Sequence, residues 1–132
     1  MQAVDTNILV RFLVKDDLDQ AKLVYQLFKK TEQARSYLFV PLPVMLELIW
    51  VLESAYSIAR NDIIEAMADL LLMPILKFEH HPALQEFVHS APGTSYDLSD
   101  MLIGCSARYQ GCKTTLTFDK KASGSDLFEL LG

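Results

Sequence analysis

Four acidic side chains stand where they could together bind a divalent metal ion. Asp5 and Asp119 each follow a short segment that is expected to form a buried strand, whereas Glu47 and Asp100 lie in the first turns of expected helices. In a fold of alternating strands and helices, these places converge at one edge of the sheet. Clustered carboxylates repel one another without a cation, and Mg²⁺ or Mn²⁺ prefers such all-oxygen sites. These residues therefore predict metal-assisted hydrolysis of a phosphodiester in nucleic acid.

Each acid also has a purely structural interpretation. Asp5 suits the N-cap of the helix that follows it, and Asp97 and Asp100 suit the N-cap and N3 positions of another helix. Glu47 could pair with an Arg or Lys, although no basic residue lies within a helical turn of it. Capping or pairing alone could thus explain these acids.

The elements that must position the acids alternate along the chain. This order predicts an α/β fold with a central, mainly parallel sheet flanked by helices. Polar or proline-containing breaks separate the segments, and each helix is expected from apolar residues at helical spacing. The expected strands are 3–4, 37–40, 75–78 and 113–118, and the expected helices are 8–13, 17–30, 44–55, 60–72 and 97–111.

The helix expected over 44–55 is unusually apolar. From Val44 to Leu52 only Glu47 is charged or strongly polar, and an ionised carboxylate among apolar neighbours is costly unless it is paired or bound to metal. We expect a core stripe along one face and contact with another chain on a second face. The core stripe is Val44, Leu48 and Val51, and the face toward the other chain is Met45, Leu46, Ile49 and Trp50.

Length and composition limit the remaining possibilities. A chain of 132 residues with 51% hydrophobic residues indicates one globular domain over 1–132. Two cysteines without a zinc-binding or disulfide pattern indicate a reducing cytoplasm, and neither a leader nor a membrane span of about 18 apolar residues is expected. The net charge of −5 argues against a broad phosphate-binding surface. It does not exclude an enzyme whose metal ion supplies the positive charge. The three histidines form no HExxH motif and are interpreted as structural or surface residues: His80, His81 and His89.

Four motifs stand in order along the chain. They are Val-Asp-Thr-Asn at 4–7, Glu47 within its apolar helix, Asp-Leu-Ser-Asp-Met-Leu-Ile at 97–103, and Thr-Leu-Thr-Phe-Asp-Lys-Lys-Ala at 115–122. Together they resemble those of the PIN-domain family, and more narrowly those of the VapC-type ribonuclease toxins of bacterial toxin–antitoxin pairs. The resemblance covers nearly the whole chain and implies a three-layer PIN-like fold.

This resemblance implies a role for each matching residue. Asp5, Glu47, Asp100 and Asp119 match the catalytic acids that hold Mg²⁺ or Mn²⁺. Four supporting residues accompany them: Thr6 and Asn7 beside the first acid, Asp97 as the N-cap of the helix that carries the third acid, and Thr117 beside the fourth. The implied activity is that of a metal-dependent endoribonuclease toxin. It would act on RNA, form a homodimer and be neutralised by a cognate antitoxin protein. The tail over 122–126 is more polar than the family pattern.

Other functions fit these residues less well. A non-catalytic PIN-type binding scaffold would share the fold but should not bind divalent metal. A receiver-like phosphoacceptor domain does not account for Glu47 inside an apolar helix. A haloacid-dehalogenase-type phosphatase needs a second Asp two residues after the first, where this chain has Asn7.

Overall fold

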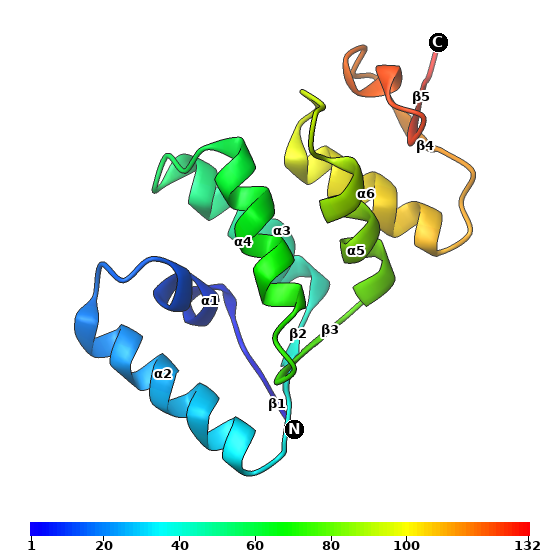
Figure 1. Cartoon of the computed structure of the whole chain (residues 1–132). Coiled ribbons are helices and arrows are strands. Elements are labelled where there is room, and N and C mark those ends of the chain that lie inside the picture. The colour runs from blue at the N-terminus through cyan, green and yellow to red at the C-terminus, as the bar shows by residue number, and fades with distance from the viewer. The chain divides into compact units, whose positions relative to one another are not determined.

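All residues, 1–132, are described by the computed structural model. The chain forms two compact units, the first over Met1–Glu79 and the second over His80–Gly132. Each unit has its own parallel strands and its own helices (Figure 1). The predicted α/β fold of parallel strands with flanking helices is therefore confirmed.

The first unit contains a three-stranded parallel sheet in which β2 lies between β1 and β3. In the register of this sheet, Leu38 on the central strand pairs with Gln2 on one side and with Leu76 on the other. Four helices accompany the strands. The elements are β1 (Gln2–Ala3), α1 (Thr6–Leu13), α2 (Leu18–Gln33), β2 (Leu38–Val40), α3 (Leu42–Ser54), α4 (Arg60–Leu71) and β3 (Leu76–Phe78).

The rotation of α3 differs from the one expected. Its buried stripe is Met45, Leu48, Ile49 and Leu52, whereas Val44 and Val51 are only partly buried. The predicted stripe was wrong because both sets have helical spacing and an almost wholly apolar helix offers no polar face to choose between them. Met45 and Ile49, expected to contact another chain, instead lie in the core, and Leu46 is partly buried. Trp50 does lie on the surface, with 64% of its area exposed.

The second unit packs two helices with a two-stranded parallel sheet. Thr115 pairs with Phe128 in that sheet, and α5 contacts α6. Close packing of α6 on the segment that leads into the last strand depends on Gly104, because a Cβ at this position would lie 2.9 Å from Leu127 Cβ. The elements are α5 (His81–Ser90), α6 (Leu98–Tyr109), β4 (Thr115–Thr117), the short 3₁₀ helix η1 (Ala122–Gly124) and β5 (Phe128–Leu130).

The strand expected over 113–118 was predicted to lie in the core, and this prediction was wrong. Leu116 is 62% exposed and Phe118 is 79% exposed. The strand is only three residues long and pairs with β5, which follows the polar tail and was not predicted. Alternation of side chains along β4 leaves one of its faces uncovered.

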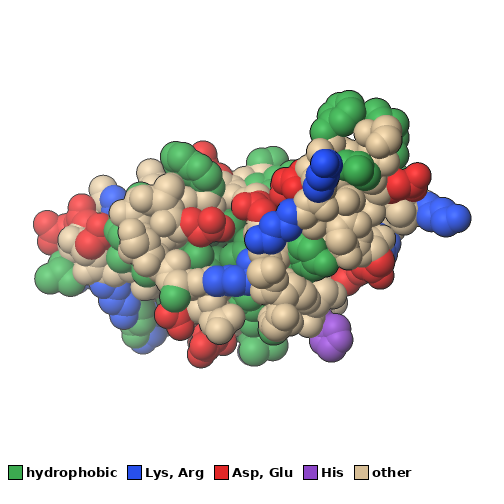
Figure 2. All heavy atoms as spheres, turned by 90° about the horizontal axis from the view of Figure 1, so that it is seen from above, with side chains coloured by type: hydrophobic (Ala, Val, Ile, Leu, Met, Phe, Trp, Pro, Cys, Tyr) green, Lys and Arg blue, Asp and Glu red, His purple; other side chains and the backbone are tan.

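Hydrophobic side chains also reach the surface elsewhere, among acidic and basic ones (Figure 2). No helix combines the length and the apolar character needed to cross a membrane. Of the histidines, His80 is the N-cap of α5 in a left-handed conformation, and its ring lies 3.4 Å from Ser106 Oγ and 3.1 Å from Gln110 Nε2. These contacts fit the structural role expected for it.

Candidate functional site

Asp5 occupies the turn between β1 and α1. Its Oδ1 accepts a hydrogen bond from the Ile8 backbone N–H at 3.4 Å, so the capping role is present. The carboxylate is nevertheless exposed, and its second oxygen has no partner within the protein. The next residue, Thr6, is buried beneath the turn, whereas Asn7 is exposed. Asp5 can therefore cap the helix and still offer an oxygen to a ligand.

An open hollow of about 390 Å³ lies beside Asp5 on the first unit. Apart from the carboxylate of Asp5, its wall is mostly apolar. The size lies at the lower end of the range of about 300–1,000 Å³ that small-ligand sites occupy. The lining residues are Gln2, Ala3, Val4, Asp5, Ile8, Leu27 and Leu38.

Glu47 projects from α3 on the face away from the buried stripe. Its side chain is exposed, so the expected cost of burying its charge among apolar neighbours does not arise. This correction follows from the rotation of α3, which places Met45 and Leu48 inside instead. Glu47 has no ion pair with Arg or Lys. The structural explanation of a paired glutamate is therefore removed, and the carboxylate is available to a cation.

Asp97 and Asp100 divide two roles at the start of α6. Asp97 Oδ1 accepts a hydrogen bond from the Asp100 N–H at 2.9 Å, which is the predicted N-cap. Asp100, at N3, is partly buried and its carboxylate takes no part in this bond. Burial, and then the negative charges of Asp97 and Asp119, raise the pKa of Asp100 above its ordinary value. The negative charges of Asp97 and Asp119 therefore disfavour ionisation of Asp100.

Asp119 follows β4, as expected from the sequence. Its Oδ1 accepts hydrogen bonds from the backbone N–H groups of Lys121 at 2.9 Å and Ala122 at 3.1 Å. Thr117 Oγ1 in turn accepts a hydrogen bond from the Asp119 N–H at 3.0 Å. Thr117 thus holds the turn that presents the fourth acid, in line with its predicted supporting position.

Each unit contributes two of the four predicted acids. Asp5 and Glu47 belong to the first unit, and Asp100 and Asp119 belong to the second. Within neither unit do three His, Cys, Asp or Glu side chains form a group able to hold a metal ion. The type of donor nevertheless fits a hard cation, because all four offer carboxylate oxygens. The raised pKa of Asp100 reflects a repulsion that a cation would relieve.

One acid near these elements was missed by the sequence analysis. Glu79 follows β3, and its Oε1 accepts a hydrogen bond from the Leu42 N–H at 2.7 Å. The signal was present in the sequence, because Glu79 comes directly after the third expected strand, just as Asp5 follows the first. The strand-end rule that selected Asp5 would have selected Glu79 as well.

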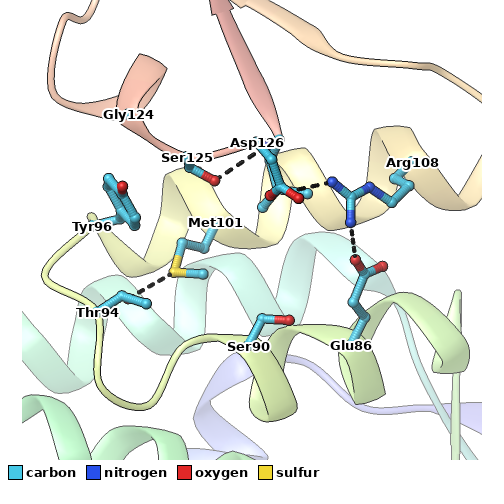
Figure 3. Close-up of a pocket in the computed structure, with 10 residues that line it drawn as sticks. Glu86, Ser90, Thr94, Tyr96, Met101, Arg108, Gly124, Ser125 and Asp126 are labelled. Atoms are coloured by element: carbon cyan, nitrogen blue, oxygen red, sulfur yellow. Dashed lines mark hydrogen bonds and ion pairs between the residues drawn. The ribbon is translucent and has the colours of Figure 1, made fainter.

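A second hollow, of about 300 Å³, lies on the second unit between α5, α6 and the segment from η1 to β5. Figure 3 shows Arg108 directed toward both Glu86 and Asp126, with which it forms ion pairs at 2.8 and 3.4 Å. None of the four candidate acids lines this hollow. It is therefore separate from the candidate site.

Comparisons with known proteins agree with the resemblance seen in the motifs. The family model described as PIN domain matches residues 3–124, which include all four acids. The chain is also similar to the VapC ribonuclease of Aquifex aeolicus (strain VF5), with 27% identity over 121 residues. That alignment covers 92% of this chain and 89% of the relative.

Proposed function

Because this chain belongs to the PIN-domain family, we propose that it is a metal-dependent endoribonuclease that hydrolyses phosphodiester bonds of RNA. We further propose that it is the toxin of a toxin–antitoxin pair and that residues 1–132 act as one domain. The similarity to a VapC ribonuclease along 92% of the chain supports this function. The observation that carries it is the set of four carboxylates, none of which has an ion-pair partner in the protein.

We propose that Asp5, Glu47, Asp100 and Asp119 hold Mg²⁺ or Mn²⁺. Such an ion, when bound, supplies positive charge that activates water and stabilises the leaving oxygen. Two of the supporting residues act through hydrogen bonds: Asp97 holds the start of α6, and Thr117 holds the turn before Asp119. Thr6 and Asn7 are the first two residues of α1, directly after Asp5, and we propose that they support the turn that presents this acid.

The buried Cys105 is poorly suited to act as a covalent nucleophile. Burial raises the pKa of Cys105 to about 11, so its thiol stays protonated at neutral pH. The alternative of a non-catalytic PIN-type scaffold differs from the enzyme in one measurable property. A pure scaffold should bind no divalent metal, whereas the four-carboxylate site should.

The test is RNA cleavage by the purified protein. We expect cleavage with Mg²⁺ or Mn²⁺, none with excess chelator, and none by Asp5→Asn. Asp69→Asn is the matched control, because Asp69 is an exposed acid on α4 outside the proposed site. Undiminished cleavage by Asp5→Asn, after its folding has been verified by circular dichroism, would overturn the assignment.

We propose that the antitoxin partner binds in a groove along α2. Two adjoining hollows share Phe12 and Tyr25; Lys22 lines one of them, and Lys29 and Glu32 line the other. An apolar floor with lysines at its rim favours an acidic, amphipathic segment of another protein. We propose that the protein acts in the cytoplasm, in agreement with its two free cysteines.

A further inference from the structure

We propose that Glu79 is a positioning residue for the reaction, because it clamps the turn that leads into α3 and thereby fixes the helix that carries Glu47. This inference rests on the proposed function, in which Glu47 is a metal ligand. Glu79 belongs to none of the four motifs, and its hydrogen-bond partners Val40 and Leu42 belong to the first unit.

Glu79 holds the turn between β2 and α3 at two points. Its backbone N–H donates a hydrogen bond to the Val40 carbonyl at 3.0 Å, and its Oε1 accepts one from the Leu42 N–H at 2.7 Å. Only Pro41 separates these two partners. One residue at the end of β3 thus fixes both the last residue of β2 and the first residue of α3.

Helix α3 cannot supply this cap from its own sequence. Its N-cap is Pro41, which makes no side-chain capping bond, and Pro43 has no N–H to donate. The Val44 N–H is already bonded to the Pro41 carbonyl at 3.0 Å. The Leu42 N–H is therefore the donor of the first turn that needs an acceptor from outside the helix. A carboxylate is well suited to this place because it also opposes the positive end of the helix dipole.

The cap acts on Glu47 through the geometry of the helix. Glu47 stands five residues after Leu42, which is about 7.5 Å along the axis at 1.5 Å per residue. The buried stripe of α3 fixes the rotation of the helix, but the first turn lies before that stripe and depends on its cap. In an α-helix the Glu47 N–H bonds to the Pro43 carbonyl, so fraying of the first turn would loosen the backbone of Glu47 itself.

Three variants separate the positioning role of Glu79 from a role as metal ligand and from the effect of losing any helix cap. Glu79→Ala removes the acceptor, and Glu79→Gln keeps an oxygen that can accept from Leu42. The matched control is Asp17→Ala, which removes a comparable cap from α2, where Asp17 accepts from the Gln20 N–H at 3.0 Å. Each protein is measured for amide hydrogen exchange, for Mn²⁺ affinity by calorimetry, and for kcat and KM of RNA cleavage.

We expect Glu79→Ala to speed exchange at the Leu42 and Val44 amides about tenfold, which is typical of a lost cap. Its Mn²⁺ affinity should fall several-fold, and its kcat should change more than its KM. Glu79→Gln should restore both exchange and affinity to within about threefold of the wild type. Asp17→Ala should speed exchange only in α2 and leave Mn²⁺ affinity unchanged.

Two results would overturn the inference. Unchanged exchange in Glu79→Ala would mean that Glu79 does not hold the turn. Equal loss of Mn²⁺ affinity in Glu79→Gln and Glu79→Ala, with α3 still protected in the former, would make Glu79 a metal ligand instead. A wild-type protein that neither binds Mn²⁺ nor cleaves RNA would refute the proposed function, whereas the exchange data would still decide whether the clamp exists. Should Glu79→Ala fail to fold, Glu79→Asp, which is one methylene too short to reach Leu42, takes its place.

Discussion

Asp97 and Asp100 stand three residues apart at one helix start, and substitutions should separate their roles. Asp97→Ala removes the hydrogen bond of 2.9 Å from the Asp100 N–H, and we expect it to cost about 1 kcal/mol of unfolding free energy. In a chain of 132 residues this corresponds to a fall in Tm of about 4 °C. Asp97→Ser retains a capping oxygen and should lose only a few tenths of a kcal/mol.

The two positions should differ most in activity. Asp97→Ser leaves the Asp100 carboxylate in place and should lose only part of the cleavage rate. Asp100→Ser removes a proposed metal ligand and should abolish nearly all cleavage. It should not lower Tm, because the pKa of Asp100 is raised by burial and by the charges of Asp97 and Asp119. Removing an acid whose ionised form is disfavoured in the folded state removes a source of instability.

The assay is the rate of RNA cleavage with Mn²⁺, together with Tm, for all three variants and the wild type. Asp69→Ser serves as the control for the loss of an exposed acid. If Asp97→Ser is as inactive as Asp100→Ser while equally well folded, then Asp97 is a catalytic ligand and the division of roles is wrong.

Three further predictions concern the charge of Asp100, the packing at Gly104 and the exposure of Trp50. Because the folded-state pKa of Asp100 is raised, ionisation of this residue destabilises the metal-free fold as pH rises from about 4 toward neutrality. Thermal melts should therefore show that the wild type loses stability relative to Asp100→Asn over this range, and added Mn²⁺ should raise the Tm of the wild type only. Gly104→Ala should lower the free energy of unfolding by about 1–2 kcal/mol in denaturant titrations, because overpacking against Leu127 exceeds the gain in helix propensity. Gly124→Ala should cost less, since only the hydroxyl end of Tyr96 must move. We expect the exposed Trp50 to be covered in the homodimer that the family resemblance implies. Light scattering should then show a dimer that Trp50→Ala weakens, and a monomer at all concentrations would contradict this.

Local features of this protein were readable from the sequence alone. The strand-to-helix turn at Asp5, the cap formed by Asp97 on Asp100 and the cap of α2 at Asp17 all depend on residues within four positions of one another. The positions of most helices and strands followed from local sequence patterns for the same reason, whereas β5 was not predicted. The types and the order of the four acids also belong to the sequence, and they sufficed to identify the family.

Tertiary packing decided what the local pattern left open. The sequence of α3 is apolar on every side, so only contact with the rest of the first unit could select Met45 and Ile49 for the core and leave Glu47 and Trp50 outside. The pairing of β4 with β5 and the clamp of Glu79 on Leu42 likewise join residues 13 and 37 positions apart. Periodicity reports which residues can share a face, but the choice of face and of distant partners depends on the free energy of packing surfaces that only the folded chain brings together.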